Sequence, residues 1–123
     1  MSQHRKALGA WGENVAVQYL QENGYTILAR NWKTKLGELD IVAQNRATIV
    51  CVEVKTRAAS RYGHYPEESV TREKQRTLRQ LAELFLRATH QPSARYRIDV
   101  IAIMLKDSGP PEIHHIQDAV QGY

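Results

Sequence analysis

The sequence has a single cysteine and no hydrophobic run long enough to cross a bilayer. One cysteine cannot form an internal disulfide. Because Cys51 lies in a β-branched run, we predict that it is buried as a small apolar side chain. The basic residues near the N-terminus are not followed by the apolar core of a signal peptide. These absences predict a soluble, cytoplasmic protein with no membrane association.

The sequence also lacks zinc-ligand spacings, a glycine-rich phosphate-binding loop, repeats and low-complexity segments. At 123 residues, the chain is expected to form one domain over residues 1–123 and to bury about two thirds of its unfolded surface. Seventeen Lys and Arg residues outnumber 13 Asp and Glu residues, which gives a net charge of +4. This balance is compatible with a polyanionic partner but does not establish one.

Residues 37–57 contain two β-strand-like runs separated by turn-forming residues, a pattern that predicts a β-hairpin. Placing the alternating apolar residues on one face sets the register, because a one-residue slip would turn one strand over. With residues 45–48 as the loop, Asp40 lies opposite Glu53 and Glu38 lies opposite Lys55. The face expected to be wholly apolar comprises Leu39, Ile41, Ala43, Val50, Val52 and Val54.

This register gathers two carboxylates and an ammonium group in one patch. Carboxylates directly opposite each other in a sheet repel. Asp40 and Glu53 therefore need either a raised pKa or a cation between them. A hard divalent metal ion is the simplest cation for that position.

Residues 5–23 have the pattern of a helix that ends at Gly24. Glu13 lies on the flank of its apolar stripe, from which its carboxylate would project toward the sheet. Spacing alone nevertheless favours a solvated helix edge for this residue. Gly9 and Gly12 lower helix propensity, so we expect the helix backbone to approach a neighbouring element closely at both.

A second helix is predicted from an N-cap at Thr71 to about residue 89. Lys74 lies on its inward stripe, where the ammonium group could reach the end of the sheet or extend into solvent. A strand is predicted over residues 96–104. Asp99 on this strand could support the basic residues or the carboxylate patch, or occupy an edge position.

Basic residues flank the hairpin on both sides. Arg30 precedes it, and Arg57 and Arg61 follow it in a segment that also contains tyrosines. These side chains could contact phosphates and stack bases, or they could be ordinary surface residues.

The predicted order is helix, three strands, helix, strand, followed by a weak strand over residues 112–116. The first three strands form antiparallel hairpins, and the second helix makes a right-handed parallel crossover to the next strand. The expected fold class is α/β, with a mixed β-sheet flanked by helices.

This order, together with Asp40 and the Glu53-Val54-Lys55 tripeptide, resembles the restriction-endonuclease-like core of the PD-(D/E)xK nuclease superfamily. More closely, the chain resembles the small bacterial YraN-like endonuclease family, which is similar to archaeal Holliday-junction resolvases. Leucine stands where the superfamily motif has proline, which removes no ligand. The matching residues span most of the chain: Gly12-Glu13, Arg30-Asn31, Gly37-Glu38-Leu39-Asp40-Ile41, Val52-Glu53-Val54-Lys55-Thr56-Arg57, Lys74 and Arg97-Ile98-Asp99-Val100.

The resemblance implies a site for Mg²⁺ or Mn²⁺, which prefer hard oxygen ligands. Lys55 would orient or deprotonate the attacking water, or stabilise charge on the phosphate. Glu13 would hold a metal-bound water or a second ion, and Lys74 would contact the scissile phosphate. The implied metal ligands are the carboxylates of Asp40 and Glu53 and the carbonyl of Val54.

The implied function is metal-dependent hydrolysis of phosphodiester bonds in DNA, with branched or junction DNA among the candidate substrates. A homodimer would suit a symmetric junction. Two alternatives stay open: a nuclease-fold domain that binds nucleic acid without cutting it, and a protein-interaction module. The expected nucleic-acid contacts are Arg30, Arg57, Arg61 and Lys74.

Overall fold

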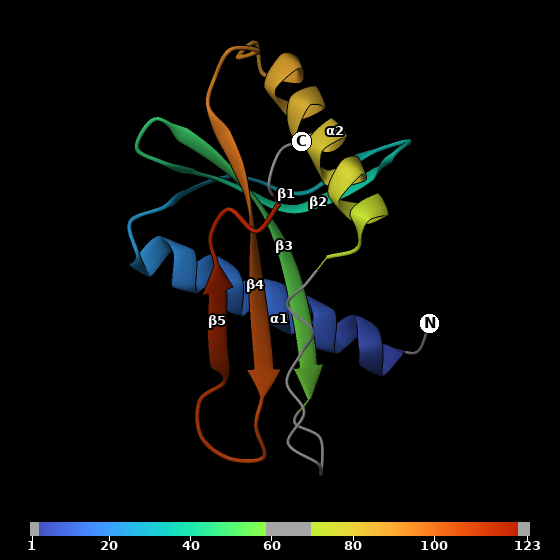
Figure 1. Ribbon diagram of the computed structural model, residues 1–123. Helices are drawn as coiled ribbons and strands as arrows, with labels where there is room; N and C mark the ends of the chain where they lie inside the picture. The colour runs from blue at the N-terminus through green and yellow to red at the C-terminus, as the bar shows by residue number, and fades with distance from the viewer. Residues whose placement is uncertain (1–2, 59–69, 121–123) are drawn as a thin grey trace.

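The computed structural model describes residues 3–58 and 70–120, which form two helices and a five-stranded mixed sheet (Figure 1). The predicted α/β class and order of elements are confirmed, including the last strand, for which the sequence signal was weak. Within these ranges, no helix is long and apolar enough to cross a membrane. The elements are α1 (Gln3–Glu22), β1 (Thr26–Thr34), β2 (Gly37–Asn45), β3 (Thr48–Ala58), α2 (Arg72–Ala88), β4 (Tyr96–Leu105) and β5 (Glu112–Ile116).

The strands follow one another across the sheet in the order β1-β2-β3-β4-β5. Strands β1, β2 and β3 pair antiparallel, β3 and β4 pair parallel through the α2 crossover, and β5 returns antiparallel to β4. Figure 1 shows α1 and α2 on opposite sides of this sheet. Strand β3 therefore lies at the centre, with a helix over each of its faces.

The helix ends follow from local sequence. Gly24 adopts a positive φ of 88° after α1, and the N–H of Tyr25 then donates to the Leu20 carbonyl at 2.9 Å. The Thr71 hydroxyl caps α2 by accepting the N–H of Lys74 at 3.2 Å. Both predicted helix boundaries are confirmed to within two residues.

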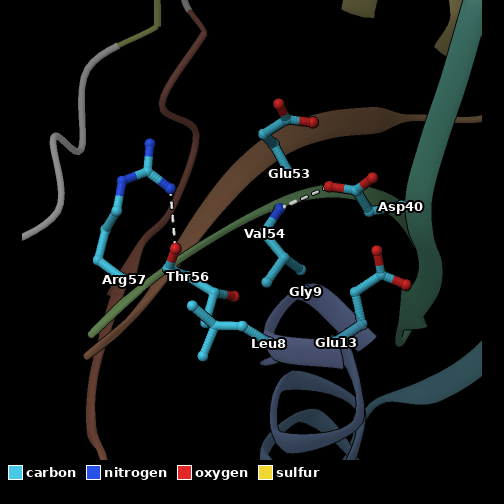
Figure 2. Close-up of a pocket in the computed structure, with 8 residues that line it drawn as sticks. All are labelled: Leu8, Gly9, Glu13, Asp40, Glu53, Val54, Thr56 and Arg57. Carbon is cyan, nitrogen blue, oxygen red and sulfur yellow. Dashed lines mark hydrogen bonds between the residues drawn. The ribbon is translucent and has the colours of Figure 1, made fainter. Parts of the chain in front are cut away.

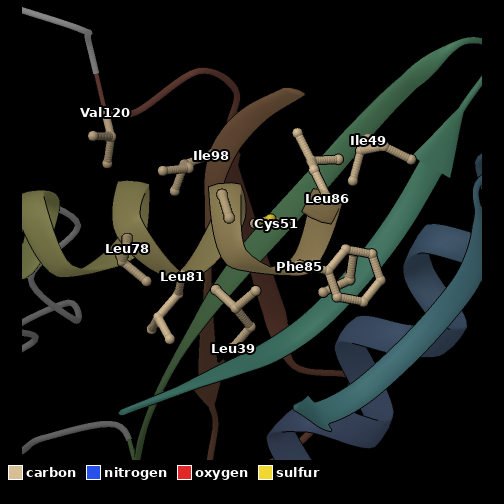
Figure 3. Close-up of a cluster of buried hydrophobic side chains, with 11 residues drawn as sticks. Leu39, Ile49, Cys51, Leu78, Leu81, Phe85, Leu86, Ile98 and Val120 are labelled. Atoms are coloured by element: carbon tan, nitrogen blue, oxygen red, sulfur yellow. The ribbon is translucent and has the colours of Figure 1, made fainter. Parts of the chain in front are cut away.

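Both faces of the hairpin are buried. The predicted apolar face is confirmed for Ile41, Ala43, Val50, Val52 and Val54, and it is wrong for Leu39, which lies on the other face. The α1-side cluster contains Ile41, Val50 and Val52, whereas the α2-side cluster contains Val42 and Cys51. Burial raises the pKa of the Cys51 thiol to about 12, as expected for an inert apolar position. Figure 3 shows the α2-side cluster, whose labelled members are Leu39, Ile49, Cys51, Leu78, Leu81, Phe85, Leu86, Ile98 and Val120.

The alternation of side chains breaks at Asp40. Leu39 lies in the α2-side cluster and Ile41 in the α1-side cluster, although residues two apart on a regular strand share a face. On β1, Asn31 lies between the residues paired with Leu39 and Ile41, and it has a positive φ of 52°. The β1–β2 ribbon therefore turns over locally at Asn31 and Asp40.

Helix α1 crosses β3 at very close range. A Cβ on Gly12 would overlap the Thr56 side chain, whereas a Cβ on Gly9 would meet nothing within 4 Å. The predicted close approach is therefore confirmed at Gly12 and wrong at Gly9. This contact holds the flank of α1 that carries Glu13 against the end of β3.

We predict opposite effects of alanine at the two glycines. Gly9→Ala should stabilise the protein by up to about 1 kcal/mol, because alanine favours the helix and has space. Gly12→Ala should instead destabilise it, because overpacking costs about 1–3 kcal/mol and exceeds the gain in propensity. Urea unfolding of both variants tests this, and equal midpoints would contradict the close contact at Gly12.

Candidate functional site

A cleft of about 680 Å³ lies where α1 meets the end of β3 (Figure 2). Three acidic side chains from three elements reach it: Glu13 from α1, Asp40 from β2 and Glu53 from β3. We call it the acidic cleft. Its lining residues are Leu8, Gly9, Glu13, Asp40, Glu53, Val54, Thr56 and Arg57.

At the end of the β2–β3 pairing, the side chain of Asp40 accepts a hydrogen bond from the main chain of β3. The described β2–β3 pairs run from Asn45↔Thr48 to Ile41↔Val52, in the predicted register. Beyond them, the carboxylate of Asp40 accepts the main-chain N–H of Val54 at 2.9 Å, where a carbonyl of β2 would otherwise bind. The strands therefore separate at the residue that faces the cleft.

The predicted pairing of Glu38 with Lys55 is not present. Glu38 pairs instead with Lys33 of β1, whose Nζ lies 3.9 Å from its carboxylate. The reason is that β2 pairs with β3 only from Ile41 to Asn45, so the hairpin register does not extend back to position 38.

Asp40 has a strongly perturbed carboxyl group. Burial and the nearby Glu53 carboxylate raise the pKa of Asp40 to about 7, with Glu13 and a hydrogen bond to the Glu53 side chain adding to the effect. The hydrogen bond from Val54 acts in the opposite direction. Asp40 thus shows one of the two outcomes expected for facing carboxylates, a raised pKa.

Glu13 points into the cleft rather than into solvent, as Figure 2 shows. Burial raises the pKa of Glu13, and the Glu38 and Glu53 carboxylates add to this effect, while Asn31 and Arg30 oppose it. The spacing-based preference for a solvated helix edge is therefore wrong.

The cationic residues lie around the cleft at different distances. The ammonium Nζ of Lys74 lies 3.4 Å from Glu53 Oε2, and Arg57 lines the cleft wall with its guanidinium on the Thr56 carbonyl. Arg30 donates to Asn14 on the α1 side at 2.8 Å.

Lys55 lies on β3 between two lining residues, and strand alternation puts it on the Glu53 face. Arg61 lies outside the described residues.

The donor chemistry of the cleft fits a hard divalent ion. Mg²⁺ typically binds through one or two carboxylates and keeps several waters, and Asp40 and Glu53 supply two neighbouring carboxylates in the cleft. Between residues 3–58 and 70–120, however, no three His, Cys, Asp or Glu side chains form a group that could hold a metal. The Val54 carbonyl, which the resemblance implies as a ligand, is a further hard oxygen donor of the kind that such an ion prefers.

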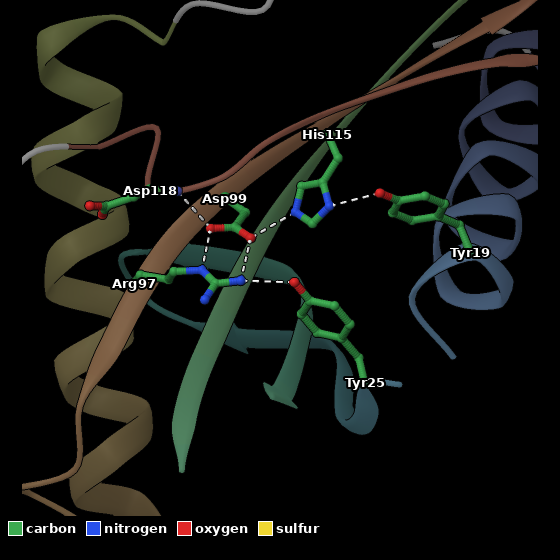
Figure 4. Close-up of polar contacts among 6 residues, drawn as sticks. All are labelled: Tyr19, Tyr25, Arg97, Asp99, His115 and Asp118. Atoms are coloured by element: carbon green, nitrogen blue, oxygen red, sulfur yellow. Dashed lines mark hydrogen bonds and ion pairs between the residues drawn. The ribbon is translucent and has the colours of Figure 1, made fainter. Parts of the chain in front are cut away.

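Asp99 belongs to a second polar cluster, shown in Figure 4, and none of the residues drawn there lines the acidic cleft. It is fully buried, and it neither supports Arg30 or Arg57 nor lies at a sheet edge, since β4 pairs on both sides. Its carboxylate accepts hydrogen bonds from Arg97 at 3.0 Å and from His115 at 2.7 Å. It also accepts the Asp118 N–H at 2.9 Å.

The cluster around Asp99 ties four segments together. His115 Nδ1 lies 3.0 Å from the Tyr19 hydroxyl of α1, and Arg97 donates to the Tyr25 hydroxyl at 2.8 Å. Burial would raise the pKa of Asp99, but hydrogen bonds from His115, Arg97 and the Asp118 main chain outweigh it and lower the pKa. Sequence reasoning missed His115 and Asp118 because they lie 16 and 19 residues from Asp99 along the chain. Arg97 is only two residues from Asp99 and therefore on the same face of β4, which was an available signal.

We predict that metal-free protein loses stability as the pH rises from about 4 to 7. The folded state holds a proton on Asp40 that the unfolded chain, with a pKa near 3.8, releases earlier. Its contribution is therefore complete at low pH and lost as the pH passes 7, at most about 4 kcal/mol at roughly 1.4 kcal/mol per pKa unit.

Urea melts in EDTA at pH 5 and pH 8 measure this loss. Asp40→Asn should reduce it, whereas Asp107→Asn on the exposed surface should not. The same pH dependence in wild type and Asp40→Asn would contradict a raised Asp40 pKa.

We predict that Asp99→Ala destabilises the protein by about 3–5 kcal/mol, because the Arg97 guanidinium would lose its buried partner. Asp107→Ala, at an exposed position, should change stability by less than about 0.5 kcal/mol. Denaturant unfolding of both variants tests the difference. A loss below about 1 kcal/mol for Asp99→Ala would show that the cluster is not a structural requirement.

The chain is similar to curated proteins along nearly its whole length. A family model described as "Uncharacterised protein family UPF0102" matches residues 12–103. A UPF0102 protein of Rhodococcus opacus is 46% identical over 116 residues, covering 94% of this chain and 98% of the relative. UPF0102 proteins of Syntrophomonas wolfei and Herpetosiphon aurantiacus are 45% and 40% identical, covering 93% and 95% of this chain and 97% and 96% of the relatives. The resemblance to small bacterial YraN-like proteins is confirmed at this level: the chain belongs to the uncharacterised protein family UPF0102.

Proposed function

We propose that this protein is a divalent-metal-dependent nuclease that hydrolyses phosphodiester bonds, with DNA as its substrate. The observation that carries the proposal is the meeting of Asp40, Glu53 and Glu13 in one cleft, two of them with raised pKa values. Perturbed carboxyl groups in a cleft are typical of functional sites. Asp40 faces another carboxylate, whereas the carboxylate of Asp99, which has a structural role, is surrounded by donors.

Different residues of the cleft would bind the metal ion, orient a water molecule and bind the substrate phosphate. Asp40, Glu53 and the Val54 carbonyl would hold Mg²⁺ or Mn²⁺, which supplies Lewis-acid polarisation and a more acidic bound water. Glu13, on the opposite wall, would orient a water through its carboxylate. Arg57 at the cleft edge would hold a phosphate of the substrate.

Two lysines are candidates for the group that acts on the attacking water or the phosphate. The resemblance assigns this role to Lys55, whereas Lys74 has its ammonium beside Glu53. A cation at either position would stabilise the negative charge that builds on the phosphate in the transition state.

Non-catalytic nucleic-acid binding is the second candidate. The observation that favours it is that no three acidic, histidine or cysteine side chains in the described part of the chain are grouped to hold an ion. Such a domain would bind nucleic acid through its cations, with affinity that falls as the salt concentration rises, and would cut nothing.

We predict cleavage of at least one nucleic acid from a panel of linear and branched DNAs and RNAs, in Mg²⁺ or Mn²⁺ and not in EDTA. Glu53→Gln and Asp40→Asn should reduce the rate by at least about 100-fold, and Lys55→Ala by less. Glu112→Gln on β5, the same change outside the cleft, should leave it unchanged. Cleavage in EDTA, or an unimpaired Glu53→Gln, would overturn the proposal, while salt-dependent binding without cleavage would support the second candidate.

A further inference from the structure

The ion pair between Lys74 and Glu53 joins α2 to the edge of the acidic cleft. The Nζ of Lys74 lies 3.4 Å from Glu53 Oε2, and the side chains are 44% and 14% exposed. The ammonium group is therefore reachable from solvent, while the carboxylate it neutralises is mostly enclosed.

The helix itself does not explain a lysine at this position. Lys74 is the third residue of α2, and a cation in the first turn opposes the helix dipole. Its N–H is bound by the Thr71 cap, so the helical backbone at this point is held in place. The charge of Glu53 is the feature of the structure that favours a cation here.

The carboxylates of the cleft need more positive charge than one lysine supplies. Three carboxyl groups, from Asp40, Glu53 and Glu13, line the cleft, and Lys74 is paired with Glu53. A divalent ion brings two charges to the same oxygens. It would also repel the ammonium group, since like charges a few ångströms apart destabilise each other.

We propose that Lys74 is an exchangeable counter-ion: it neutralises Glu53 in the metal-free protein and leaves Glu53 when a divalent cation binds. This inference rests on the metal site of the proposed function and adds a regulatory step to it. Exchange requires little energy, because a partly exposed ion pair is weak. In the metal-bound protein, the Lys74 ammonium is then available beside the cleft for a substrate phosphate.

Calorimetric titration of metal-free protein with Mn²⁺, without nucleic acid, tests the exchange. Lys74→Met should bind Mn²⁺ about three- to ten-fold more tightly than wild type, because the competing cation is removed. Lys74→Arg keeps the charge and should stay within about two-fold of wild type. Lys33→Met is the matched control, since Lys33 pairs with Glu38 outside the cleft lining, and it should also stay within two-fold.

Nuclear magnetic resonance of the protein with ¹³C-methylated lysines follows the ammonium group directly. Saturating Mg²⁺ should move the Lys74 signal toward the position of solvent-exposed lysines and leave the Lys33 signal in place. The signal of Lys74 is assigned by its disappearance in Lys74→Arg.

The outcomes separate the two proposals. If no variant binds Mn²⁺, or Glu53→Gln binds it as wild type does, the metal site itself is wrong. If wild type binds Mn²⁺ at Glu53 but Lys74→Met is no tighter than Lys33→Met, or the Lys74 signal does not move, the exchange is wrong and the metal site stands.

Discussion

The hydrogen bond from the Val54 N–H to the Asp40 carboxylate is the interaction on which the arrangement of the cleft depends. It satisfies a backbone donor of the central strand with a side chain, so β2 can leave β3 without an unpaired buried N–H. The separation of the strands leaves space beside Val54 into which Glu13 and Glu53 project. One carboxylate therefore both ends the strand pairing and supplies the first acidic group of the cleft.

Two aspartates show how differently one residue type behaves in this fold. Asp99 is fully buried, yet its donors lower its pKa, because every side of its carboxylate is matched. Asp40 is more exposed to solvent than Asp99, yet its pKa is raised, because its partial burial is reinforced by the Glu53 and Glu13 carboxylates and opposed by only one main-chain donor. Burial acts to raise the pKa of both carboxyl groups, and the neighbours of each decide whether its pKa ends above or below the ordinary value. Asp99 joins structural elements through its donors, whereas Asp40, beside other carboxylates, is placed to bind a cation.

Much of the fold could be predicted from the sequence because local patterns determine it. The period-two alternation and the turn at residues 45–48 gave the hairpin register, and Gly24 and Thr71 marked helix ends. The second buried face was missed, although the unbroken apolar run at residues 49–52 is typical of a central strand covered on both sides. The turn of the ribbon was not predicted, although asparagine, the residue at position 31, adopts the left-handed conformation more often than most residue types. The lysine beside Glu53 could only be placed once the crossover brought α2 to the strand end.

The cluster around Asp99 also sets the extent of the folding unit. The family match ends at residue 103, but two of the donors that keep Asp99 ionised, His115 and the main chain of Asp118, come from beyond it. The segment after β5 is also held by a hydrogen bond of 2.8 Å from the Ala119 N–H to the Ile98 carbonyl. A chain shortened to the matched region would bury Asp99 with two donors fewer and would expose the β4 edge to pairing with other molecules. The residues after 103 thus complete the donors of Asp99 and pair the outer edge of β4.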